Sequence, residues 1–109
     1  MPVFEPGKIL TVILPSDANR ENPPTWQIKA LSCRESMELG DRLAEELKGK
    51  DDTQQFETLA AILDEYVAGW DGLTVPYAPG KLLDVCGPRD LYQLDNAIRY
   101  NFGVTEKKA

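Results

Sequence analysis

The first thirty residues contain two short segments with the hydrophobic pattern of β-strands. Residues 8–14 are rich in β-branched side chains and end before a proline, which has no backbone N–H to donate to a continuing strand. Residues 25–30 alternate strictly between apolar and polar side chains, as in a strand with one buried and one wet face. The pattern predicts an antiparallel β-hairpin over residues 8–30. The polar, Pro- and Asn-rich loop 15–24 is either a solvated connector or a partner-binding tip.

Helical spacing replaces this alternation after residue 32. Ser32 is followed three residues later by Glu35, which is the pattern of a capping box at a helix start. Apolar residues then recur at helical intervals up to Gly49, where a helix is expected to stop. We therefore predict a helix over residues 33–48. Its apolar positions are Cys33, Met37, Leu43, Ala44 and Leu47.

The clearest helical stripe lies in the middle of the chain. Asp51 or Asp52 can cap its start, and two glycines near residue 70 offer a left-handed end. The spacing predicts one continuous helix that ends around Trp70 and forms the spine of the core. The stripe consists of Phe56, Leu59, Ala60, Leu63, Tyr66, Val67 and Trp70.

Prolines divide the last third of the chain. They predict a short helix over residues 79–85 and a final helix over residues 88–100, followed by a frayed tail at 103–109. Together these elements predict a single α+β domain over residues 1–109, in which the hairpin is followed by about four helices within residues 32–102 that pack on it.

Composition narrows the class of partner. The 109 residues have a net charge of −6, which disfavours binding to nucleic acid and to anionic membranes. The apolar runs are far shorter than the roughly 20 residues that a membrane helix needs. The N-terminus lacks the basic region of a signal peptide, so we expect a cytoplasmic protein.

The sequence offers little chemistry for catalysis. It has no histidine, and its two cysteines, Cys33 and Cys86, are interpreted as small buried hydrophobic residues. No glycine-rich phosphate loop and no spacing of metal ligands is present, so we expect no catalytic residue, no cofactor and no metal. An enzyme that works through carboxylates is the alternative, and it would need one carboxyl group with a raised pKa. Its candidates are Asp64, Glu65, Asp71, Asp84 and Asp90.

The last helix carries more apolar residues than one inward stripe can hold. The surplus predicts an exposed aromatic patch for protein–protein contact. The alternative is that the tyrosines lie flat over the rim of the sheet with their hydroxyl groups in water. The predicted partner-binding residues are Leu91, Tyr92, Tyr100 and Phe102.

The order of these segments resembles the small tail assembly chaperones of long-tailed bacteriophages and prophages. The resemblance covers most of the chain: a strand pair that ends at residues 26–32, a Glu-rich helix, a spine helix that ends at residues 66–72, a proline-led leucine segment at 82–85 and a last helix over residues 91–98. Its most specific part is the Gly-Trp-Asp-Gly turn, which is followed by a Pro- and aromatic-rich stretch and an acidic leucine helix.

This resemblance implies a non-catalytic protein in the cytoplasm of the bacterial host. Members of that family bind the aggregation-prone tape measure protein and help to recruit tail tube subunits around it, and they often form homo-oligomers. A structural virion component, such as a tail or neck subunit, is the alternative function. The family has no catalytic motif, so the resemblance assigns no active site.

Overall fold

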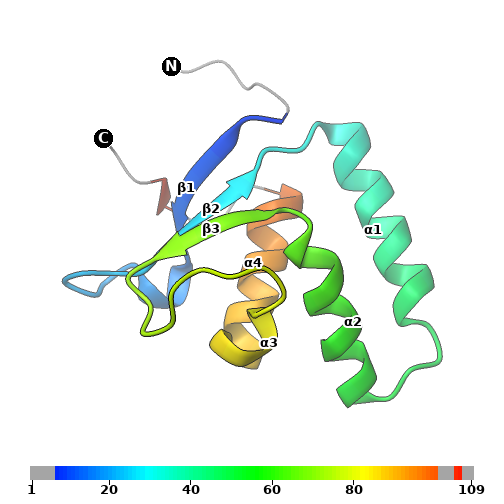
Figure 1. The fold of residues 1–109 in the computed structure, drawn as a ribbon. Coiled ribbons are helices and arrows are strands. Elements are labelled where there is room, and N and C mark those ends of the chain that lie inside the picture. The colour runs from blue at the N-terminus through cyan, green and yellow to red at the C-terminus, as the bar shows by residue number, and fades with distance from the viewer. Residues whose placement is uncertain (1–6, 101–104, 107–109) are drawn as a thin grey trace.

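The computed structural model describes residues 7–100 and 105–106 as one α+β arrangement (Figure 1). The strand hairpin comes first and the helices follow, which confirms the predicted fold class. A short 3-10 turn, Pro15–Asp17, lies between the first two strands. The other elements are β1 (Ile9–Ile13), β2 (Thr25–Lys29), α1 (Cys33–Leu47), α2 (Asp52–Asp64), β3 (Val67–Asp71), α3 (Leu82–Val85), α4 (Pro88–Tyr100) and β4 (Thr105–Glu106).

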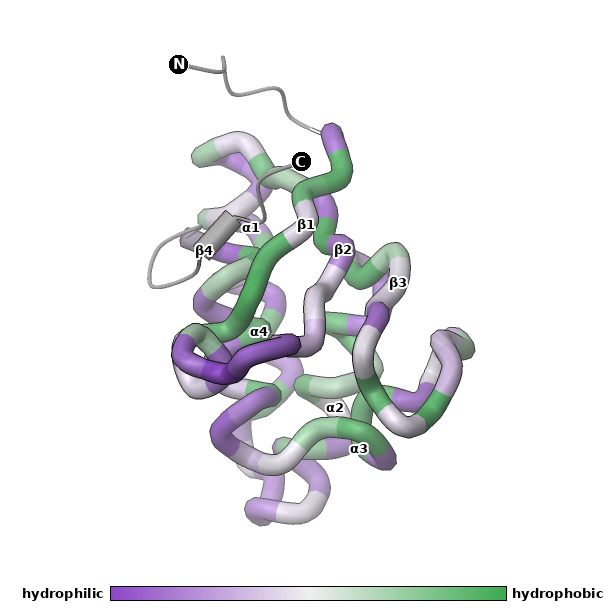
Figure 2. Tube along the Cα trace, turned by 90° about the vertical axis from the view of Figure 1, so that its left-hand side faces the viewer, coloured by the Kyte–Doolittle hydropathy of each residue, from purple (hydrophilic) through white to green (hydrophobic). Residues whose placement is uncertain are grey.

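The described strands form one antiparallel sheet in the order β3-β2-β1-β4. Val12 of β1 lies opposite Trp26 of β2, and Trp26 lies opposite Trp70 of β3. The two indole rings are 5.5 Å apart and tilted by 58°, a favourable arrangement for two aromatic rings. Figure 2 shows β1, β2 and β3 in front of α2 and α4, so these helices cover one face of the sheet.

The predicted continuous helix up to Trp70 is wrong. Helix α2 ends at Asp64, and the segment that follows is strand β3. Val67 and Trp70 are still buried, but they are buried as residues of the sheet. The physical reason is that the glycine in this segment weakens a helix, while the β-branched Val67 and the aromatic Trp70 favour a strand when a partner strand is available. Strand β2 provides that partner, and its position is not visible in the local sequence.

Glycine is required where β3 leaves the sheet. Gly72 has a φ of 84°, a backbone conformation that L-residues with a side chain rarely adopt. A Cβ atom at this position would also lie 3.1 Å from Cα of Pro24. The glycine therefore lets the chain turn directly beside the end of the loop that precedes β2.

The helix starts follow the sequence closely. Ser32 and Glu35 form the predicted capping box of α1, and Asp51 forms a second capping box with Gln54 at the start of α2. Each box satisfies two backbone donors that a helix start leaves unpaired. The fully buried side chains come from the strands, their flanking residues and the helices: Val12, Leu14, Ile28, Leu39, Leu63, Leu82, Leu94 and Ile98.

Three predicted inward positions of α1 are exposed. Cys33 and Ala44 are exposed and Met37 is 66% exposed, whereas Leu39 and Leu43 are buried. Helix α1 packs against α2 and α4 rather than against the sheet, so only its Leu39–Leu43 side is covered (Figure 1). Cys86 is half-buried; burial first and the charge of Asp90 second raise its pKa to about 12, so it stays a thiol at neutral pH.

The end of the chain also differs from the predicted frayed tail. Thr105 and Glu106 form β4 and pair with Ile13 and Val12 of β1. The other residues of 103–109 lie outside the described part of the chain.

We predict that Leu63→Ala and Trp70→Ala strongly destabilise the protein. Leu63 is fully buried, and Trp70 is buried with its indole N–H donating to the carbonyl oxygen of Val75 at 2.8 Å. Truncation of such side chains costs about 2–5 kcal/mol. Urea unfolding followed by far-UV circular dichroism measures the change. Met37→Ala is the control and should stay within about 0.5 kcal/mol of the wild type; a similar loss in Met37→Ala would contradict this assignment of the core.

Candidate protein-binding groove

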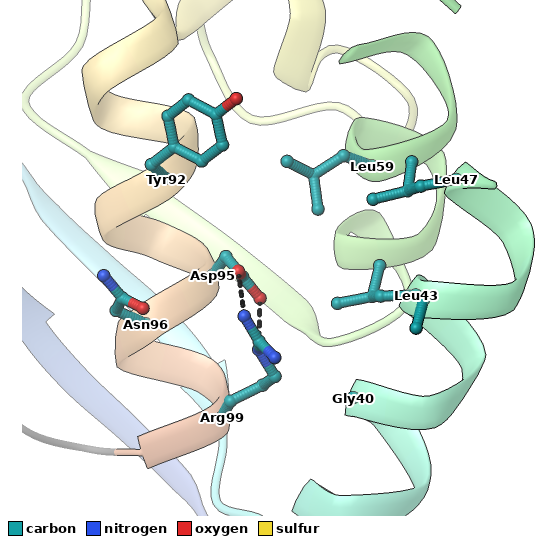
Figure 3. Close-up of a pocket in the computed structure, with 9 residues that line it drawn as sticks. Gly40, Leu43, Leu47, Leu59, Tyr92, Asp95, Asn96 and Arg99 are labelled. Atoms are coloured by element: carbon teal, nitrogen blue, oxygen red, sulfur yellow. Dashed lines mark hydrogen bonds and ion pairs between the residues drawn. The ribbon is translucent and has the colours of Figure 1, made fainter. Parts of the chain in front are cut away.

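A groove with a volume of about 410 Å³ lies between α1, α2 and α4 (Figure 3). It is lined by Gly40, Leu43, Ala44 and Leu47 of α1, by Leu59 of α2, and by Tyr92, Asp95, Asn96 and Arg99 of α4. The groove exists because α1 stands away from the sheet and meets α4 along only part of its length (Figure 1).

One half of the groove is apolar. Leu43, Leu47 and Leu59 lie on one side, and Tyr92 lies across from them on α4 (Figure 3). Tyr92 is 53% exposed, and its ring is 5.7 Å from the ring of the half-buried Phe56. An exposed aromatic ring beside leucines is typical of an anchor position in a protein–protein contact.

The other half contains a closed ion pair within α4. Nε and Nη2 of Arg99 donate to the two carboxylate oxygens of Asp95 at 2.8 and 2.6 Å (Figure 3). Burial lowers the pKa of Arg99, but the hydrogen bonds and charge of Asp95 outweigh this and raise it. Because Asp95 is 6% exposed and paired through both oxygens, this end of the groove is polar without a free carboxylate.

Gly40 of α1 lies beside Arg99 of α4. A Cβ atom there would lie 3.5 Å from Nη1 of Arg99, which is an ordinary van der Waals contact. One turn earlier, the hydroxyl of Ser36 donates to the backbone carbonyl of Arg99. The glycine keeps the groove open, although glycine inside a helix costs about 1 kcal/mol relative to alanine.

The three predicted partner-binding residues that the structure describes do not form one patch. Tyr92 lines the groove, as the exposed-patch prediction requires. Leu91 is only 3% exposed and belongs to the core, because it lies on the same side of α4 as Leu94 and Ile98, so its assignment to the surface was wrong. Tyr100 is 47% exposed with the Arg99 guanidinium 5.0 Å from its ring, but it does not line the groove. Phe102 lies outside the described residues.

Sequence reasoning missed the residues of α1 and the ion pair. Gly40 in the middle of an amphipathic helix was a signal for a close approach, and Asp95 and Arg99 are spaced at i,i+4 as an ion pair on one helix face. Neither signal shows which helix lies opposite. The tertiary structure supplies that information.

Three of the five candidate catalytic carboxylates, Asp64, Glu65 and Asp90, have the following structural partners. Asp64 accepts from the backbone N–H of Gly80, and Asp90 accepts from that of Gly87. Glu65 forms an ion pair with Arg42 at 2.7 Å, and this hydrogen bond lowers the pKa of Glu65. A general acid needs a raised pKa, so Glu65 does not have the property that the enzyme alternative requires.

The described residues were also compared with the requirements of a metal site and of a membrane-spanning helix. In residues 7–100 and 105–106, no cluster of three or more cysteine or carboxylate side chains is arranged to hold a metal ion. Among the same residues, no helix has both the length and the apolar composition that crossing a bilayer requires.

We predict that Gly40→Ala raises the free energy of unfolding by about 1 kcal/mol, because alanine favours the helix and its Cβ fits beside Arg99. Thermal and urea unfolding measure the change. Gly49→Ala is the matched comparison and should destabilise the protein, because Gly49 has a φ of 75°. A loss of stability in Gly40→Ala would show that α1 and α4 lie closer together than described.

In comparisons with known proteins, no family model, no curated protein and no solved structure matches this chain. Its function is therefore inferred from the groove and from the resemblance carried by its sequence.

Proposed function

We propose that this protein is a tail assembly chaperone of a bacteriophage or prophage, which binds a helical segment of the tape measure protein in the groove between α1, α2 and α4. The observation that carries the proposal is the groove itself, which is bounded by three helices, is apolar in one half and is lined by the exposed ring of Tyr92. The sequence resemblance, carried by the order of segments and the Gly-Trp-Asp-Gly motif, supports the choice of family, although the first three residues of this motif lie in β3 rather than in a turn.

The shape and chemistry of the groove suit a helical client. An amphipathic helix binds by laying its apolar side chains into a groove of this kind, with anchors spaced at i, i+3, i+4 and i+7. The exposed Ala44 and Tyr92 and the half-buried Leu47 offer the apolar surface that such anchors need, and the buried Leu43 and Leu59 lie beneath them. Charged residues around the groove keep the protein soluble before the client arrives.

The proposed role needs no chemical step. A chaperone of this kind shields apolar surface on a long helical client until tail tube subunits replace it. It acts in the cytoplasm of the host, and self-association is an expected property that the resemblance implies. Tyr92 contributes to binding as an anchor, and we assign no catalytic residue.

Co-expression tests the proposal. The tape measure protein encoded nearest to this chain is expressed alone and together with it, and the soluble fraction is compared. We expect the soluble amount of tape measure protein to rise when both are present. Equal precipitation in the two cases would contradict the proposal.

Variants locate the contact on the protein. Gly40→Trp fills the groove and Tyr92→Ala removes its aromatic wall, so both should reduce the soluble client while the variants themselves stay folded by circular dichroism. Tyr100→Ala is the control, because Tyr100 is exposed on α4 outside the groove. A loss only in Tyr100→Ala would move the contact to the end of α4.

Mass spectrometry of purified particles separates the chaperone from a structural virion component. A chaperone is absent from mature particles, whereas a tail or neck subunit remains at a stoichiometric level. Retention of this chain in particles would replace the chaperone proposal with the alternative function.

A further inference from the structure

The negative charge of the protein is concentrated on the helices that form the groove. Helices α1, α2 and α4 together carry ten acidic and four basic side chains, a net charge of −6. The whole chain also has a net charge of −6, so its remaining segments are balanced. The groove therefore lies within the acidic part of the molecule.

Two of the basic side chains near the groove are already paired. Arg42 binds Glu65 and Arg99 binds Asp95, so two of the four basic residues of these helices are engaged with carboxylates. Asp41 and Glu45, in contrast, are exposed and form no ion pair with a described residue. They directly follow the groove-lining Gly40 and Ala44 on α1, which places two negative charges beside the groove, against one positive charge from Lys48 next to Leu47.

We propose that the groove selects a basic amphipathic helix: a segment with a stripe of leucine or aromatic side chains flanked by lysine or arginine. This inference rests on the proposed function and adds the chemistry of the client segment. The apolar stripe contacts the leucines and Tyr92, and the basic flanks lie against the acidic residues of α1. Because Arg99 is bound by Asp95, it does not attract a carboxylate of the partner with a free charge.

The small side chains of the α1 wall support the same occupant. Gly40 and Ala44 leave room for a large side chain of the partner or for close approach of its backbone. A volume of about 410 Å³ is within the range of sites that enclose a compact apolar group. The exposed Met37, one turn before Gly40, extends this apolar surface along α1 and can adapt to different side chains.

Electrostatic attraction between the acidic residues beside the groove and a basic partner acts mainly on selectivity and on the rate of association. Exposed charge pairs contribute little each, but several together discriminate against a partner of the wrong sign. Their effect weakens as salt is added, because the screening length falls to about 8 Å at physiological ionic strength. The apolar contact is not weakened in this way.

Fluorescence anisotropy with three labelled peptides of equal length tests the inference on the full-length protein. One peptide has leucines at helical spacing and lysines on its other face, the second has glutamates in place of the lysines, and the third is a scramble of the first without an apolar stripe. We expect the leucine–lysine peptide to bind about tenfold more tightly than each of the others. Its affinity should also fall between about 50 and 200 mM salt.

Matched variants test whether Asp41 and Glu45, the acidic residues beside the groove, cause the selectivity for the basic peptide. Asp41→Asn combined with Glu45→Gln should bring the affinities for the lysine and glutamate peptides several-fold closer together. Glu21→Gln combined with Asp84→Asn changes the net charge by the same amount on exposed residues outside the groove and should leave the ratio unchanged. Gly40→Trp should abolish binding of the leucine–lysine peptide.

The failures of the two proposals are distinguishable. If the lysine and glutamate peptides bind equally and Gly40→Trp abolishes both, the basic client is wrong and the groove proposal stands. If neither leucine peptide binds, or if Gly40→Trp has no effect, the groove proposal itself is wrong. If the scrambled peptide binds as tightly as the leucine–lysine peptide, the attraction is that of any polycation and the inference is overturned.

Discussion

The contact between Trp26 and Trp70 determines how the rest of the fold is arranged. It places β3 beside β2, so α1 and α2 must form the connection between two neighbouring antiparallel strands. The indole N–H of Trp26 is buried without a hydrogen-bond partner among the described residues, and this lowers the stability of the folded state. The indole N–H of Trp70, in contrast, donates to the backbone carbonyl of Val75. Tyr77 packs edge-on against Trp70 and closes this end of the core.

The groove follows from that arrangement. Helix α2 returns the chain to the sheet, and α4 covers the same face, so α1 is left as an outer helix that packs mainly against α2 and α4 (Figure 1). Its Leu39–Leu43 side is buried, while Gly40 and Ala44 face a space that no described element fills. Helix α1 also carries five acidic residues and two basic ones. One helix therefore provides both a wall of the groove and the negative charge beside it.

The prediction of a helix up to Trp70 failed for a specific physical reason. Phe56, Leu59 and Leu63 truly share a helix face, and the stripe continues arithmetically through Val67 and Trp70. Spacing alone cannot distinguish a longer helix from a helix followed by a strand, because both bury the same residues. Pairing with β2 decides between them, since it satisfies the backbone donors and acceptors of β3 and places Trp70 against Trp26.

The amino-acid sequence by itself determined the α+β class, the hairpin and the starts of the first two long helices, because alternation and capping boxes act between residues close in the chain. Only the tertiary structure decided the third strand, the buried position of Leu91 and the groove around Gly40. These depend on contacts between distant segments, and a side chain of given hydrophobicity becomes core or surface according to the element that packs against it.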